Sequence, residues 1–149
     1  MGAFYGSIHV RTDDVDAVRK VLDSAAKRKW KFLVSPIIDG WVAVYPSQHG
    51  QDERVSKAIA KELDSPILHV AVHDDDVFYY WYYRDGKVID RFSSCPEYFG
   101  QISPRMKILL RGKPERLADL LTIPGDLQRL LGLVEAMRTE PLFASDRPE

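Results

Sequence analysis

The sequence has a single cysteine, no asparagine and no long hydrophobic run. One cysteine excludes an internal disulfide and any metal site built from several thiolates, which favours a reducing cytoplasm. Without asparagine there is no acceptor for N-glycosylation. No apolar stretch approaches the roughly 20 residues that span a bilayer, and no secretory signal pattern is visible. These absences predict a cytoplasmic protein that is not attached to a membrane.

Neither sign of charge is in clear excess, with 21 Lys and Arg against 22 Asp and Glu. The near balance gives no overall attraction to nucleic acid or to an anionic membrane. A glycine-rich phosphate loop is also missing. The 149 residues suit one domain. We expect a sheet core over residues 1–92, a connector over 93–103, a helical tail over 104–140 and a frayed terminus over 141–149.

The most informative stretch, residues 66–92, predicts three consecutive strands. They cover Ile67–His73, the aromatic segment Val77–Tyr83, and Lys87–Phe92. The sequence HDDD makes the first turn. Asp85-Gly86 makes the second, since this pair supplies the positive φ angles of a tight hairpin.

The preceding residues predict a split βαβ pattern. The expected order is a strand at Phe4–Arg11, a helix to about Ala26, a strand at Lys31–Ile38, a strand at Trp41–Tyr45 and a helix through Val55–Leu63. The fold class is therefore α+β, a ferredoxin-like βαββαβ antiparallel sheet. Right-handed crossovers place the fourth strand beside the first, the first beside the third and the second at an edge. The later hairpin would extend the sheet from the fourth strand.

Strand alternation divides the predicted sheet into two faces. Apolar residues assigned to the face under the two helices are Ile8, Val10, Phe32, Val34, Val42, Val44, Leu68, Val70 and Val72. The second face would carry Tyr5, His9, Arg11, Leu33, Trp41, Ala43, Tyr45, His69, Ala71 and His73. Such an aromatic face needs a cover. The C-terminal helices, a second subunit or a ligand could each provide it.

Candidate ligand-binding residues lie mainly on that second face. They are His9, Trp41, Tyr45, His69 and His73, followed by Asp74 and Asp76 in the turn. Imidazole and carboxylate together suit a metal ion, although the same residues are typical of a polar turn. The sequence predicts no catalytic set and no cofactor. Cys95 has the character of a small apolar residue, with a nucleophile as the alternative.

The aromatic strand offers one further interpretation. Ferredoxin-like sheets can stack nucleic-acid bases on exposed rings. The alternation of basic and aromatic residues expected of an RNA-binding sheet is absent, so we expect the strand to lie between two layers instead.

The segment HDDDVFYYWYYRDGKVIDRFSSCPEYF resembles a group of uncharacterised bacterial proteins. The likeness consists of an acidic turn, an aromatic strand, a DG hairpin and an exit motif S-x-x-P-x-Y-F, and it is strongest over residues 40–99. The resemblance implies a bacterial cytoplasmic origin and transfers no functional residue. Tyr98 and Phe99 of the exit motif are expected to fill the gap between sheet and tail.

These features favour a non-enzymatic module that binds a ligand, a protein partner or a second copy of itself. A small metal-dependent enzyme or metal-binding protein that uses the His and Asp cluster is the alternative. A sheet that binds single-stranded nucleic acid is the second alternative.

Overall fold

The computed structural model describes residues 2–25, 30–48 and 50–120. Residues 121–140 of the predicted helical tail and the predicted frayed terminus lie outside this range. No helix in the described part of the chain is long and apolar enough to cross a membrane.

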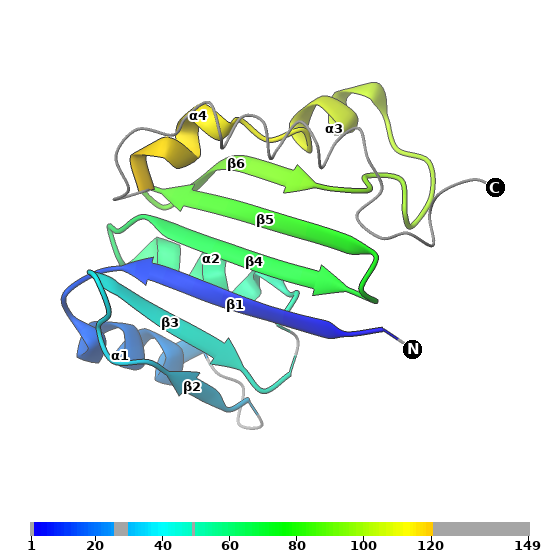
Figure 1. The fold of residues 1–149 in the computed structure, drawn as a ribbon. Coiled ribbons are helices and arrows are strands. Elements are labelled where there is room, and N and C mark those ends of the chain that lie inside the picture. The colour runs from blue at the N-terminus through cyan, green and yellow to red at the C-terminus, as the bar shows by residue number, and fades with distance from the viewer. Residues whose placement is uncertain (1, 26–29, 49, 121–149) are drawn as a thin grey trace.

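The described residues form an α+β fold around a six-stranded antiparallel sheet (Figure 1). Its strands are β1 (Phe4–Arg11), β2 (Phe32–Val34), β3 (Trp41–Pro46), β4 (Ile67–His73), β5 (Val77–Arg84) and β6 (Lys87–Ser93). The helices are α1 (Val15–Ala25), α2 (Glu53–Glu62), α3 (Pro104–Leu109) and α4 (Pro114–Leu117), followed by a 3₁₀ turn (Ala118–Leu120). The strand order β2-β3-β1-β4-β5-β6 reproduces the predicted neighbours, with the hairpin β5–β6 extending the sheet from β4.

Aspartate and glycine form two tight hairpin turns, among them the predicted Asp85-Gly86 turn. Asp39 and Gly40 have φ of 51° and 80°, and Asp85 and Gly86 have φ of 50° and 71°. Positive φ at both central residues is what the favoured two-residue hairpin requires, because it matches the right-handed twist of the strands. In the β4–β5 turn, Asp74 and its successor also adopt positive φ, 55° and 61°. The short polar side chain of aspartate tolerates this conformation.

Strand β2 is shorter than predicted. It covers three residues, whereas the sequence pattern extended from Lys31 to Ile38. Pro36 has no N–H group and cannot continue a ladder of hydrogen bonds. The Ser35 N–H donates to the Ala43 carbonyl at 2.9 Å, but the Ala43 N–H donates to the Ser35 hydroxyl at 2.8 Å instead of to a backbone carbonyl. The regular backbone pairing with β3 therefore ends at Ser35.

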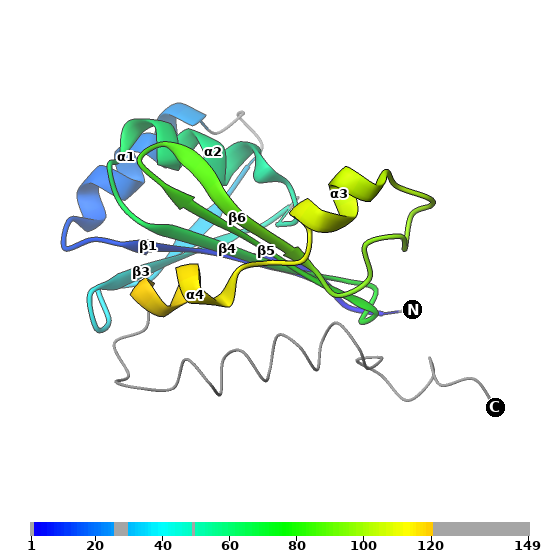
Figure 2. The same cartoon turned by 90° about the horizontal axis from the view of Figure 1, so that it is seen from above.

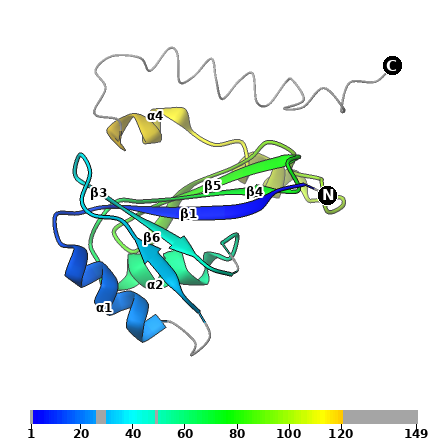
Figure 3. The same cartoon turned by 60° about the horizontal axis from the view of Figure 1, so that its bottom comes forward.

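Helices cover both faces of the sheet. α1 and α2 lie on one face and α4 lies on the other (Figures 2 and 3). Buried apolar residues on the α1–α2 side, here called the first face, are Ile8, Val10, Val18, Val21, Leu22, Val42, Val44, Val55, Ile59, Ala60, Ile67 and Tyr83. Those on the second face are Tyr80, Tyr82, Phe92, Leu117 and Leu120. The aromatic strand β5 thus lies between two layers, as expected.

The predicted faces were right for β1 and β3 and wrong for β4. Ile67 belongs to the first-face core, and Leu68 and Val70 pack against the second-face cluster. His69 is opposite Ile8 in the register, which places its side chain on the first face. Alternation was misleading here, because Leu68, Val70 and Val72 form a wholly apolar set, whereas the set that faces the helices includes two histidines. Only the pairing with β1 fixes which set faces the helices.

The C-terminal segment covers part of the second face. Leu117 and Leu120 are buried against the aromatic rings of β5 and β6. The buried Asp90 accepts the backbone N–H of Lys113 at 2.9 Å, which fixes the start of α4. At the other end of this face, Leu33 and Tyr45 remain exposed.

Candidate functional site

Aromatic rings from distant parts of the chain surround His73 at the end of β4. The ring of Phe4 lies 4.8 Å from His73 between centroids, in an edge-to-face arrangement. Phe99 lies 4.8 Å away and Tyr98 5.7 Å away, both also edge-on. Such contacts are favourable because the positive edge of one ring meets the negative face of another. The start of β1 and the turn after β6 therefore meet at this histidine.

Carboxylates of the β4–β5 turn adjoin these rings. The Tyr98 hydroxyl donates to Asp76 Oδ2 at 3.1 Å and lies 3.5 Å from Asp74 Oδ2. The hydrogen bond to Asp76, helped by partial desolvation and by the charges of both carboxylates, raises the pKa of Tyr98 to about 12. Asp74 Oδ1 also accepts the backbone N–H of Gly2 at 2.8 Å. Phe4, His73, Asp74, Asp76, Tyr98 and Phe99 are called the His73 surface below.

The loop before α2 supports the His73 surface from the first face. Gln51 Oε1 lies 2.8 Å from His73 Nδ1, and Gln51 Nε2 donates to the Val72 carbonyl at 2.6 Å. Since the amide oxygen can only accept, His73 Nδ1 carries the proton. A depression of about 450 Å³ lies beside the rings. Its lining is Phe4, Tyr5, Gly50, Gln51 and Asp52.

The rings of the His73 surface remain open to solvent. Phe4 is 56% exposed and Phe99 is 73% exposed. The expectation that Phe99 fills the gap between sheet and tail is therefore wrong. The exit motif turns it outward onto His73 instead, beside the acidic turn.

His69 is part of the protein core rather than of a surface site. Its side chain is fully buried on the first face. Nε2 donates to the Gly50 carbonyl at 2.6 Å, so Nδ1 accepts the Ser56 hydroxyl at 2.9 Å. The Tyr83 hydroxyl lies 3.0 Å from Ser56 Oγ and 3.2 Å from Glu53 Oε1. A serine–histidine pair can serve nucleophilic catalysis, but this one is closed to substrate and joins α2 to β4.

The remaining candidates lie apart from the His73 surface. His9 is half-buried on the second face, where its Nε2 lies 2.9 Å from Ser7 Oγ. Trp41 packs beside the second-face cluster and Tyr45 is exposed opposite Leu33. The structure thus brings together His73, Asp74 and Asp76 from the predicted set, and separates them from His9, Trp41, Tyr45 and His69.

The predicted metal cluster does not assemble. His9 is on the second face and His69 on the first. Within residues 2–25, 30–48 and 50–120, no group of three His, Cys, Asp or Glu side chains is placed to hold a metal ion. The sheet between the two histidines is the physical reason.

Burial makes the fully buried His69 and the half-buried His9 resist protonation. Desolvation lowers the pKa of His69, opposed by its hydrogen bond to Gly50, and desolvation also lowers the pKa of His9. Unfolded histidines bind protons near pH 6.5, so below this pH the unfolded chain binds more protons than the folded one. The free energy of unfolding should therefore fall as the pH falls from about 7 to about 5. The limiting slope is about 1.4 kcal/mol per pH unit for each histidine.

Urea unfolding at several pH values in this window checks the expectation. His9→Gln should flatten only part of the slope and leave the contribution of His69. A free energy of unfolding that stays constant over the whole window would contradict the protonation argument.

Sequence reasoning did not identify Phe4 and Gln51 as parts of this region, and it placed Tyr98 and Phe99 elsewhere. An adjacent Tyr-Phe pair in a turn, next to charged and glycine residues, was the available signal. Its position against His73 depends on how the β6 exit folds back, which no local pattern encodes.

No protein-family model, curated protein or solved structure matches the chain. The function proposed below rests on the geometry of the described residues.

Proposed function

We propose that this chain is a non-catalytic binding module whose His73 surface takes an arginine or lysine side chain of a protein partner. The observation that carries the proposal is the meeting of exposed aromatic rings with the carboxylates of Asp74 and Asp76. Aromatic faces attract cations, and neighbouring carboxylates add charge complementarity. No Lys or Arg belongs to the His73 surface itself.

The shape of the region supports a protein partner over an enclosed small molecule. The rings are exposed, and the adjoining depression is bordered by Tyr5, which is 57% exposed. Exposed aromatic residues gathered at one place are unusual on a monomer and are enriched in binding hot spots. A partner that inserts a guanidinium between Phe99 and Asp76 would satisfy both kinds of group.

Two other functions have less support. The rings of Tyr80, Tyr82 and Tyr83 are buried, so these parts of β5 are closed to nucleic-acid bases. His9 and His69 of the metal alternative lie on different faces of the sheet.

The single cysteine, Cys95, is free and exposed, which fits the proposed cytoplasmic location.

The test is calorimetric titration of the full chain with a hexa-arginine peptide at a fixed ionic strength. Phe99→Ala should weaken binding about 2- to 30-fold, which corresponds to the about 0.5–2 kcal/mol of a cation–π contact. Asp76→Asn should weaken binding as well and make it less sensitive to salt.

Two matched variants control for general effects. Leu33→Ala removes another apolar side chain of similar exposure, 75%, at the far edge of the sheet. Asp85→Asn removes a carboxylate from the β5–β6 turn, which has the same backbone conformation. Both should bind the peptide like the unmodified chain. Equal weakening by Leu33→Ala and Phe99→Ala would defeat the proposal.

We further propose that β1 to β4 with α1 and α2 form a ferredoxin-like unit. The support is the alternation of strands and helices along the chain together with the order β2-β3-β1-β4. In this arrangement the hairpin β5–β6 is an addition at the β4 edge, and the turns before and after it carry Asp74, Asp76, Tyr98 and Phe99 of the His73 surface.

A further inference from the structure

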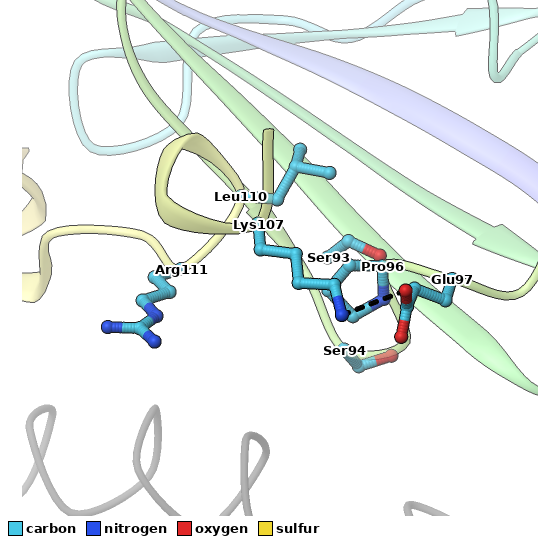
Figure 4. Close-up of a pocket in the computed structure, with 7 residues that line it drawn as sticks. All are labelled: Ser93, Ser94, Pro96, Glu97, Lys107, Leu110 and Arg111. Atoms are coloured by element: carbon cyan, nitrogen blue, oxygen red, sulfur yellow. Dashed lines mark ion pairs between the residues drawn. The ribbon is translucent and has the colours of Figure 1, made fainter. Parts of the chain in front are cut away.

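A separate cavity of about 480 Å³ lies between the exit of β6 and α3 (Figure 4). Its lining comes from the strand end, the turn after it and one side of α3 with the residues that follow. The lining residues are Ser93, Ser94, Pro96, Glu97, Lys107, Leu110 and Arg111. The volume is in the range of small-molecule sites. None of the lining residues belongs to the His73 surface.

Ser93 provides the strongest indication that this cavity holds a ligand. The residue is 4% exposed, and its hydroxyl is buried without a hydrogen-bond partner in the described structure. Buried hydroxyls are nearly always paired, so an unpaired one beside a cavity indicates a partner from outside the chain. The neighbouring Ser94 hydroxyl accepts the N–H of Phe78 at 2.9 Å, which leaves its own proton available to a ligand.

The charges of the lining decide which ligand fits. Lys107 pairs with Glu97 at 2.8 Å, and both side chains are nearly half-exposed. Exposed pairs of this kind are weak and exchange readily. Arg111 lies at the margin of the lining, and Figure 4 shows its side chain pointing away from that pair. Lys107, in an exposed and exchangeable ion pair, and the hydroxyls of Ser93 and Ser94 are therefore the donors that this lining offers to an anion.

We infer that this cavity binds the oxyanion of a small organic molecule, a phosphate or a carboxylate. The anion would replace Glu97 on Lys107 and accept the hydroxyl protons of Ser93 and Ser94. Pro96 and Leu110 line the same space and offer apolar contact to the body of the ligand. The anion thereby supplies the partner that the Ser93 hydroxyl lacks.

The test uses NMR titration of the full chain with inorganic phosphate, propionate and glycerol at constant ionic strength. We expect saturable shifts of the Ser93, Ser94 and Lys107 amide signals with at least one of the two anions. Neutral glycerol and added chloride should cause no saturable shift. The tighter of the two anions identifies the ligand class. Shifts that rise linearly without saturation for both anions would overturn the inference.

Variants locate the site. Lys107→Gln should weaken the anion about tenfold or more, since it removes a charged donor. Lys57→Gln is its matched control, because Lys57 is a similarly exposed lysine paired with Glu53 on α2. Equal weakening by the two variants would show that general charge, rather than this cavity, attracts the anion.

Ser93→Ala separates a binding role from a structural one. Removing an unpaired buried hydroxyl should leave the melting temperature without ligand unchanged or higher, while the anion binds more weakly. Anion binding equal to that of the unmodified chain would remove Ser93 from the site. Phe99→Ala should bind the anion normally, so this result and the test of the His73 surface can fail independently.

Discussion

Gly6→Ala is expected to lower the free energy of unfolding by about 3 kcal/mol, because the new methyl group would collide with backbone. A Cβ at Gly6 would lie 1.9 Å from the carbonyl oxygen of Gly50 and 2.4 Å from its carbonyl carbon. Backbone atoms cannot rotate out of the way as a flexible side chain can. The 50–52 loop would have to move away from β1.

Moving this loop would also disturb the site. The Gly50 carbonyl accepts the His69 Nε2 proton at 2.6 Å, and Gln51 lies 2.8 Å from His73 Nδ1. Gly6→Ala should therefore leave the buried His69 with an unpaired donor and loosen the support of the His73 surface. Weaker binding of the hexa-arginine peptide should accompany the loss of stability.

Urea unfolding of three glycine variants checks this explanation. Gly40→Ala adds a methyl group with nothing within 4 Å, at a φ of +80°, and should cost only about 1 kcal/mol of backbone strain. In Gly50→Ala the nearest atom would be the Gly6 nitrogen at 2.7 Å, which predicts an intermediate effect. If Gly6→Ala were no more destabilising than Gly40→Ala, the explanation by close backbone contact between Gly6 and Gly50 would be wrong.

The sequence predicts elements well where the residue type determines the backbone. Both Asp-Gly pairs form their hairpins, and β1 and β4 have the predicted bounds. Pro36 shortens β2, a boundary that the apolar pattern alone extended too far. Local conformational preference was therefore a reliable guide to turns, and proline should have outweighed periodicity at that strand end.

Predicting which side chains face one another required long-range information. The pattern of β4 was ambiguous because Ile67 and Leu68 are equally suited to a core. Placing His69 inside depends on partners from α2 and its preceding loop, Ser56 and Gly50, and these are known only once the helix packs on the sheet. The same limit explains why Phe99 was expected under the tail and lies against His73.

The second large effect is expected for Asp90→Ala, with a loss of about 3 kcal/mol in the free energy of unfolding. Asp90 is 6% exposed, and its Oδ2 accepts both the Tyr80 hydroxyl and the Lys113 N–H at 2.9 Å. Its Oδ1 accepts the N–H of Arg91 at the same distance. Alanine would leave these donors without their acceptor in a largely buried place.

The consequences should be concentrated on the second face. Lys113 immediately precedes α4, whose Leu117 packs against the aromatic cluster with Tyr80. Losing the Asp90 acceptor should therefore release the start of α4 and expose the rings beneath it. Hydrogen exchange should become faster in β5 and β6, with less change in β1 and β3 on the far side of β4.

Asp64→Ala is the matched control, because Asp64 is an exposed aspartate in the connection between α2 and β4. This variant should change the free energy of unfolding by less than about 0.5 kcal/mol. Asp90→Asn should have an intermediate effect, because one amide oxygen can still accept at the Oδ2 position while the amide nitrogen opposes the N–H of Arg91. A full-size loss in Asp90→Asn would indicate that the negative charge, rather than the acceptor geometry, is what the C-terminal segment needs. A loss below about 1 kcal/mol in Asp90→Ala would mean that apolar packing of Leu117 and Leu120 holds this segment without Asp90.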